Sequence, residues 1–202
     1  MKLYFSPGAC SLSPHIVLLE AGLNFSAERV DLREKKTASG EDFRAINPKG
    51  YVPALALDDG TVLTEGAAIV QYLADLAPAA GLLPPVGDAA RYKVIAWLSF
   101  ISSELHKNYS PLFNPATPEE FKAVVREKLV SRYKWVDEQL AGKDYFTGEH
   151  FSVVDAYLFT VTNWAKPTGV DLSAYANVTA FMARVAARPA VQEALKAEGL
   201  AK

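Results

Sequence analysis

A segment rich in proline and glycine, between residues 77 and 88, divides this chain into two parts with different sequence patterns. Helices and strands both tend to end at such residues, which here are Pro78, Gly81, Pro84, Pro85 and Gly87. Before the segment, short strand-like and helix-like runs alternate, and after it the hydrophobic periodicity is only helical. We therefore predict an α/β domain at 1–80, a linker at 81–88 and an all-helical domain at 89–202.

Short apolar runs define the expected elements of the first part. Strands are predicted at 2–5, 27–31, 51–57 and 61–63, and helices at 13–21, 39–46 and 68–76. Asp58, Asp59 and Gly60 lie between the last two strands and favour a tight hairpin. These two strands are therefore expected to be antiparallel neighbours.

The second part is predicted to form a helical bundle. Its helices are expected at 89–107, 118–140, 153–164, 177–187 and 190–198. The clearest helix start is at Ser152, because Asp155 three residues later can complete a variant of the capping box.

Composition excludes several classes of function. The net charge of -2 provides no long-range attraction to nucleic acid or to an anionic membrane. A single cysteine cannot form an intramolecular disulfide, which fits a reducing cytoplasm. The apolar start of the chain soon meets Pro7, unlike a signal peptide, and no apolar run approaches the roughly 18 residues of a membrane span. We expect a soluble, cytoplasmic protein.

The only cysteine, Cys10, lies between the first predicted strand and the first predicted helix. A thiol at the first turn of a helix is close to unpaired backbone N–H groups and to the positive end of the helix dipole, which favour the thiolate. The alternative is a buried cysteine that acts as a small hydrophobic residue. Cys10 is thus a candidate reactive thiol.

Two later runs have features of a ligand site. If the Val52–Pro53 bond is cis, the Val52 backbone is free to pair with an extended peptide, whereas a trans proline has only an edge-strand role. Gly66 opens the next helix and allows a carboxylate close to its N–H groups. Glu65 either accepts from a ligand ammonium group or only complements the helix dipole. Lys35 is either a solvated loop lysine or the partner of a second carboxylate.

A polar stripe follows one face of the first helix of the bundle. Ser99, Ser103 and His106 recur at steps of four and three residues. His106 titrates near neutrality and can share a proton with a thiol. The alternative is a helix-end histidine that hydrogen bonds to the last carbonyl groups.

Together these runs resemble the cytosolic glutathione S-transferases, most closely the bacterial beta class. The resemblance covers essentially the whole chain and depends on the order and spacing of four runs, at 6–11, 50–55, 63–73 and 104–107. It implies the glutathione transferase fold, in which a thioredoxin-like α/β amino-terminal domain precedes an all-α helical domain.

The resemblance also implies roles for individual residues. The proline corresponding to Pro53 is cis in the family, and the backbone before it binds the cysteinyl part of glutathione. Glu65 and Gly66 correspond to positions that hold the γ-glutamyl end, and Lys35 to one that meets the glycyl carboxylate. The implied catalytic residues are Cys10, Ser11 and His106. The other implied glutathione contacts are Ala9, Val52, Ser99, Ser103 and Lys107.

Two further expectations concern the second part. Tyr109, Phe113 and Trp164 are expected to line an apolar substrate pocket, although aromatic side chains on helices are more often core. Beta-class relatives often have an asparagine in place of Ser99 that reaches the glutathione of the neighbouring subunit. Because serine is shorter, this contact is left open.

The reaction implied by the resemblance is attack by the glutathione thiolate on an electrophilic carbon of an apolar substrate. Glutathione is then the co-substrate, and no metal or prosthetic group is required. One alternative is a thiol transferase or reductase that holds glutathione as a mixed disulfide on Cys10. Another is a non-catalytic carrier of glutathione or hydrophobic ligands. The family also implies a homodimer.

Overall fold

The computed structural model describes residues 1–201 and contains two compact units. The first consists of Met1–Pro85 together with the chain from Arg188 onward, and the second is Val86–Ala187. The residues from 188 onward were expected in the helical domain, so the compact units differ from the expected domains at this end of the chain. Helical periodicity identifies this last segment as a helix but does not indicate which unit its apolar face packs against.

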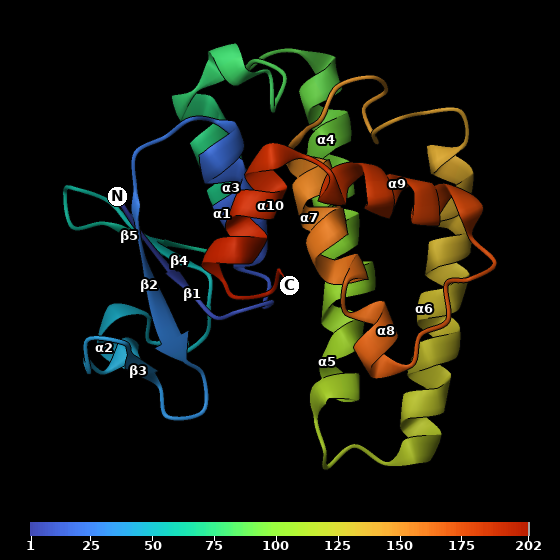
Figure 1. The fold of residues 1–202 in the computed structure, drawn as a ribbon, viewed down its shortest axis with the longest axis horizontal. Coiled ribbons are helices and arrows are strands. Elements are labelled where there is room, and N and C mark those ends of the chain that lie inside the picture. Colours follow the sequence, from blue (N-terminus) through green and yellow to red (C-terminus); the bar gives the residue numbers. More distant parts are fainter. Residues whose placement is uncertain (202) are drawn as a thin grey trace. The chain divides into compact units, whose positions relative to one another are not determined.

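The first unit contains a five-stranded mixed sheet with the strand order β3-β2-β1-β4-β5 (Figure 1). Its strands are β1 (Lys2–Phe5), β2 (Ser26–Asp31), β3 (Lys36–Thr37), β4 (Ala54–Ala56) and β5 (Val62–Thr64). β1 pairs with β2 in parallel and with β4 in antiparallel orientation. β4 and β5 are antiparallel neighbours, which confirms the predicted hairpin. β3 was not predicted, because two residues are too few to produce a periodic pattern.

Helices cover both faces of this sheet. The helices of this unit are α1 (Leu12–Glu20), α2 (Phe43–Ile46), α3 (Gly66–Leu76), the short 3-10 helix η1 (Pro78–Ala80) and α10 (Pro189–Ala197). Tyr4 and Phe5 are adjacent in β1 and point to opposite faces. The Tyr4 ring packs against Phe43 of α2, whereas the Phe5 ring packs against His15 of α1. The sheet therefore lies between α2 on one side and α1 on the other.

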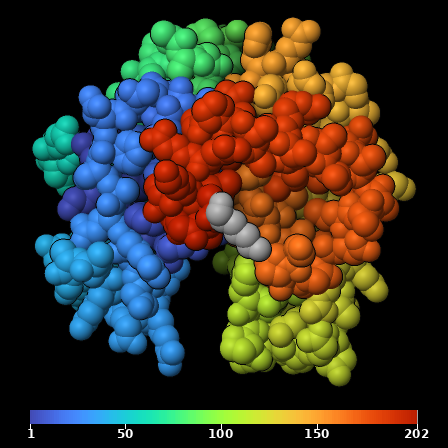
Figure 2. Space-filling view, in the orientation of Figure 1, coloured from blue at the N-terminus to red at the C-terminus, as the bar shows by residue number. Residues whose placement is uncertain are grey.

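The last helix, α10, packs along α1, and α1 also packs along α3 (Figure 1). In the space-filling view the red side chains of α10 lie directly against the blue side chains of the first part of the chain (Figure 2). Arg188 begins this segment, and its guanidinium donates to both carboxylate oxygens of Glu20, at 2.6 and 2.8 Å. This bidentate salt bridge joins the end of α1 to the start of α10.

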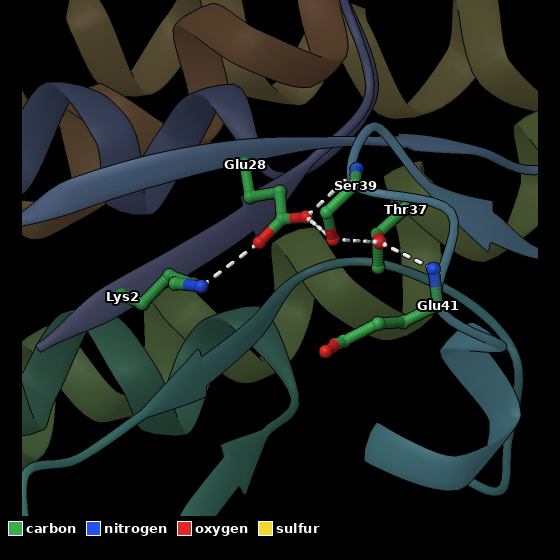
Figure 3. A network of polar contacts seen from close by, with 5 residues as sticks. All are labelled: Lys2, Glu28, Thr37, Ser39 and Glu41. Carbon is green, nitrogen blue, oxygen red and sulfur yellow. Dashed lines mark hydrogen bonds and ion pairs between the residues drawn. The ribbon is translucent and has the colours of Figure 1, made fainter.

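A polar network joins three strands of the sheet at Glu28 (Figure 3). Its carboxylate accepts from the Lys2 ammonium at 2.9 Å, from the Ser39 hydroxyl at 2.6 Å and from the Ser39 N–H at 3.2 Å. Ser39 also hydrogen bonds to Thr37 of β3. The Ser39 hydroxyl and the Lys2 ammonium together lower the pKa of Glu28 to about 2.

Replacing this carboxylate is expected to weaken the fold in a pH-dependent way. A lowered pKa in the folded state stabilises the protein above the unfolded value of 4.5, and this contribution is lost as pH falls toward 2. Glu28→Gln should cost about 1 kcal/mol at pH 7, because the site is partly open to solvent. Urea unfolding at several pH values checks this, with the exposed Glu34→Gln as control. A deficit that stays constant between pH 7 and pH 2.5 would contradict the network's electrostatic role.

The second unit is built from helices and the loops that connect them. Its helices are α4 (Ala89–Phe100), the π-helix η2 (Ile101–His106), α5 (Lys107–Phe113), α6 (Glu119–Leu140), α7 (Val153–Thr162), α8 (Ala165–Thr168) and α9 (Ala176–Ala186). The helix expected at 89–107 instead contains a π-helical segment and continues to Phe113. Apolar spacing alone does not distinguish α from π hydrogen bonding at this length.

The predicted capping box at the start of α7 is confirmed. The Asp155 carboxylate accepts from the backbone N–H and the hydroxyl of Ser152, at 2.8 and 2.7 Å. Its other oxygen accepts from the N–H of Phe146 at 2.9 Å. All residues of α7 are buried, so these hydrogen bonds fix the start of a fully buried helix. None of the helices in residues 1–201 is both long and apolar enough to cross a membrane.

Candidate active site

Cys10 lies in a tight loop at the start of α1. The Ala9 N–H donates to the carbonyl of Ser6 at 3.0 Å, and the Leu12 N–H donates to the carbonyl of Ala9 at 3.0 Å. The Ser11 hydroxyl is fully buried, accepts from the N–H of Ser6 and donates to its carbonyl. This geometry favours a role for Ser11 in ordering the loop that presents Cys10.

The Cys10 thiol is a hydrogen-bond donor. Its Sγ lies 3.2 Å from the carbonyl oxygen of Val52. Burial raises the pKa of Cys10 to about 12, and the Glu65 carboxylate acts in the same direction. The N–H groups of Cys10 and Ser11 lower the pKa but do not offset burial. The N–H groups at the helix start therefore favour the thiolate of Cys10 as expected, but in the protein alone desolvation outweighs them and the pKa is raised.

The segment opposite Cys10 presents its backbone to the site. The Val52–Pro53 peptide bond is cis. The Val52 carbonyl accepts from Cys10, and among the described residues the Val52 N–H has no hydrogen-bond partner. The isomer left open by the sequence is thus settled, and Val52 has an amide available to an extended ligand.

The start of α3 has an unusual backbone at Glu65. This residue has a φ of 70°, in the left-handed region that residues other than glycine rarely adopt, and such backbone is concentrated at functional sites. Its side chain is largely exposed and forms an ion pair with Lys49, which raises the pKa of Lys49. Gly66 follows at the first position of α3, where an added Cβ would meet only Pro53 Cγ at 3.7 Å. The protein's own packing therefore does not require glycine here.

The Lys35 side chain lies at the turn formed by residues 47–50. Its ammonium donates to the carbonyl of Gly50 at 2.7 Å, and its φ is 56°. Lys49, which the sequence reasoning missed, also donates to the Thr64 hydroxyl at 3.1 Å. One ammonium group, that of Lys35, thus contacts the turn at 47–50, and a second, that of Lys49, extends from this turn to the start of α3.

The C-terminal segment also supports the Cys10 loop. The fully buried carboxylate of Glu198 accepts from the Gly8 N–H and pairs with His15 Nδ1, both at 2.9 Å. The sequence reasoning missed these contacts because 183 and 190 residues separate the partners and no local pattern connects them.

In the second unit, His106 ends the π-helix and hydrogen bonds through Nδ1 to the Tyr157 hydroxyl at 2.6 Å. Trp164 packs against the same imidazole ring, with a centroid distance of 4.9 Å. Ser99 and Ser103 donate to the carbonyls of Ile95 and Ser99, at 2.9 and 3.0 Å. These two hydroxyls are thus used within the helix, while Lys107 is exposed beside His106.

The three residues expected to line a pocket, Tyr109, Phe113 and Trp164, lie together, and the Trp164 ring contacts the other two. Trp164 contacts both Tyr109 and Phe113 edge to face, each at 5.6 Å between centroids. Tyr109 is fully buried and its hydroxyl donates to Tyr133, so it belongs to the core of this unit. Phe113 is 53% exposed and is the member of the group most open to a ligand.

A five-stranded sheet with helices on both faces, a cysteine at the first helix and a cis-proline backbone opposite it define a thioredoxin-like class of thiol-binding proteins, here joined to a helical unit. The family models for the glutathione S-transferase N-terminal and C-terminal domains match residues 8–76 and 95–189. The chain belongs to the glutathione S-transferase family, and is a transferase with glutathione as co-substrate.

Individual relatives agree with this assignment. Glutathione S-transferase GstA of Escherichia coli O157:H7 is 52% identical over 99% of this chain and 100% of its own length. A solved ternary complex of BphK, a bacterial glutathione transferase, is 56% identical with a TM-score of 0.97, covering 99% of this chain and 100% of that chain. A beta-class transferase from Sphingomonas chungbukensis is 48% identical with a TM-score of 0.96, covering 99% and 100%. These neighbours place the chain beside the bacterial beta class.

Proposed function

We propose that this transferase conjugates glutathione to apolar electrophiles, and that it binds glutathione at the Cys10 loop, the Val52–Pro53 segment and the start of α3. The observation that carries the proposal is the Cys10 Sγ–Val52 carbonyl contact at 3.2 Å, next to the unpaired Val52 N–H. An extended peptide adds to such a backbone through its own amide groups. The cysteinyl part of glutathione is such a peptide, and Ala9 and Pro53 flank it.

The charged ends of glutathione fit the charges around this backbone. Glu65 supplies an exposed carboxylate for the γ-glutamyl ammonium group. The first N–H groups of α3, beginning at Gly66, suit the γ-glutamyl carboxylate, because helix starts bind anions. Lys35 supplies an ammonium for the glycyl carboxylate.

For conjugation, the glutathione thiol must lose its proton and must be held close to the electrophile. The neutral Cys10 thiol can donate a hydrogen bond to a neighbouring thiolate, as it does to Val52. His106, Ser99, Ser103 and Lys107 are proposed as further glutathione contacts, and Phe113 and Trp164 as contacts of the electrophile. The glutathione-binding domain is then 1–80 with the added segment from Arg188 onward, the linker is 81–88, and the substrate domain consists of the helices between residues 89 and 187.

The role of Glu65 provides the test of this function. Glu65→Gln should raise KM for glutathione about tenfold, because a hydrogen bond between two charged groups is replaced by one to a neutral amide. Its unfolding midpoint should stay unchanged, since the side chain is exposed. Initial rates with an aryl halide and retention on immobilised glutathione measure the change in glutathione binding, and thermal unfolding measures the midpoint, with Glu34→Gln as control. No retention of the wild-type protein would overturn the proposed function.

Cys10 also favours a second reaction, exchange of glutathione disulfides through a mixed disulfide at its sulfur. We further propose a homodimer that acts in the cytoplasm in detoxification. Sedimentation of the purified protein measures the oligomeric state, and a monomer at micromolar concentration would contradict the dimer.

A further inference from the structure

We propose that Tyr157 is a positioning residue that fixes the tautomer of His106, so that Nδ1 accepts a hydrogen bond and Nε2 carries the proton. The proposal begins from the Nδ1–hydroxyl distance of 2.6 Å. Hydrogen bonds that an N–H group donates to oxygen are usually about 2.7–3.2 Å long, whereas hydrogen bonds that a hydroxyl donates to oxygen are shorter, at about 2.5–3.0 Å. The length therefore favours the phenol as donor and the imidazole nitrogen as acceptor.

Acid–base strengths point in the same direction. A phenol with an ordinary pKa of about 10 is a good donor, and the lone pair of a neutral imidazole is a good acceptor. A neutral imidazole has one protonated nitrogen, so a phenol that donates to Nδ1 leaves the proton on Nε2.

The surroundings hold this pair in one arrangement. Tyr157 is 3% exposed and belongs to α7, all of whose residues are buried. Edge-to-face contacts with Tyr157 and Trp164 restrict rotation of the His106 ring. A ring flip would break the Tyr157 bond inside a buried environment, where an unpaired polar group costs about 1–3 kcal/mol.

The chemical consequence rests on the proposed function of His106. With Nε2 protonated, the neutral imidazole presents a donor on that nitrogen, suited to an anion such as a thiolate. In the opposite tautomer Nε2 would be an acceptor and would compete with the thiolate for protons. Tyr157 thus sets whether His106 stabilises an anion or removes a proton.

The tautomer can be read directly by NMR of the full-length protein labelled with 15N-histidine at pH 8. The chain has only three histidines, so loss of one signal set in His106→Gln assigns the ring. We expect the Nε2–H tautomer for His106 and a downfield Tyr157 hydroxyl proton that disappears in Tyr157→Phe. A protonated Nδ1, or a tautomer balance unchanged in Tyr157→Phe, would overturn the proposal. If Tyr157→Phe does not fold, the wild-type tautomer and hydroxyl proton decide.

Turnover separates this proposal from the proposed function. Tyr157→Phe should lower kcat/KM for conjugation about fivefold, as expected for one lost hydrogen bond. Tyr133→Phe is the matched control, because it removes a buried phenol hydroxyl of the same unit that hydrogen bonds to Tyr109 and Thr162. Equal losses in both variants would overturn the role of Tyr157. Absence of conjugation in the wild-type protein with the Nε2–H tautomer intact would contradict only the proposed function.

Discussion

Cys10→Ala is expected to abolish glutathione-dependent disulfide exchange and to reduce conjugation only about fivefold. Exchange requires the Cys10 sulfur, which attacks the glutathione sulfur of a mixed disulfide between glutathione and another thiol, and releases that other thiol as a thiolate. A glutathione thiolate then attacks the glutathione bound to Cys10, which leaves as glutathione disulfide and releases the Cys10 thiolate. Conjugation instead loses one hydrogen bond from the thiol, which is worth about 1 kcal/mol.

The matched variant Cys10→Ser separates these roles, because its hydroxyl can still donate as the thiol does to Val52. It should show no exchange but conjugate faster than Cys10→Ala. Parallel assays of an aryl halide and a mixed disulfide measure both activities. Equal losses of the two activities in Cys10→Ala would contradict the distinction.

The pKa of about 12 adds a pH dependence to the same experiment. In the protein without glutathione, the thiolate fraction of Cys10 should rise about tenfold for each pH unit between 7 and 10. Intact mass after reaction with oxidised glutathione or iodoacetamide follows this rise. A plateau near pH 7 would show that Cys10 is already ionised there.

Asp155→Ala is expected to cause the largest loss of stability. The change removes an acceptor shared by three donors and leaves the buried N–H groups of Phe146 and Ser152 unpaired. Because a buried donor without a partner costs about 1–3 kcal/mol, the loss should be about 3 kcal/mol or more, and Tm should fall by about 10 °C.

Asp88→Ala is the comparison for this change, because Asp88 is an exposed cap of α4 that accepts one hydrogen bond, from Ala90. It should cost about 1 kcal/mol. Burial raises the pKa of Asp155 to about 6, so the folded protein binds a proton there more tightly than the unfolded chain. The deficit of Asp155→Ala should therefore widen as pH falls from 7 toward 4. A variant no less stable than Asp88→Ala would rule out a central role for this capping box.

The fold could be predicted where the signals were local. The hairpin at Asp58–Gly60 and the capping box at Ser152 each depend on a few neighbouring residues, and both are confirmed. The π-helix before His106 was missed because its side-chain spacing is close to that of an α-helix. The position of α10 was missed because it depends on contact with α1, which begins more than 170 residues earlier.

The candidate site shows the same limit. Cys10, Val52 and Glu65 were identified from their neighbours, whereas Lys49, Tyr157 and Glu198 act through partners distant in sequence or through backbone geometry. The net shift of the Cys10 pKa could not be predicted, because a helix start has a local signature in the sequence, whereas burial is a property of the whole unit.

The discontinuous first unit also constrains the order in which the protein can be completed during its synthesis. The sheet and α1 leave the ribosome first, but Glu198, which accepts from Gly8, belongs to the last helical segment made. All of Val86–Ala187 must be translated in between, which takes on the order of ten seconds. During that interval the Cys10 loop lacks one of its supports, so the unit that starts folding first is finished last.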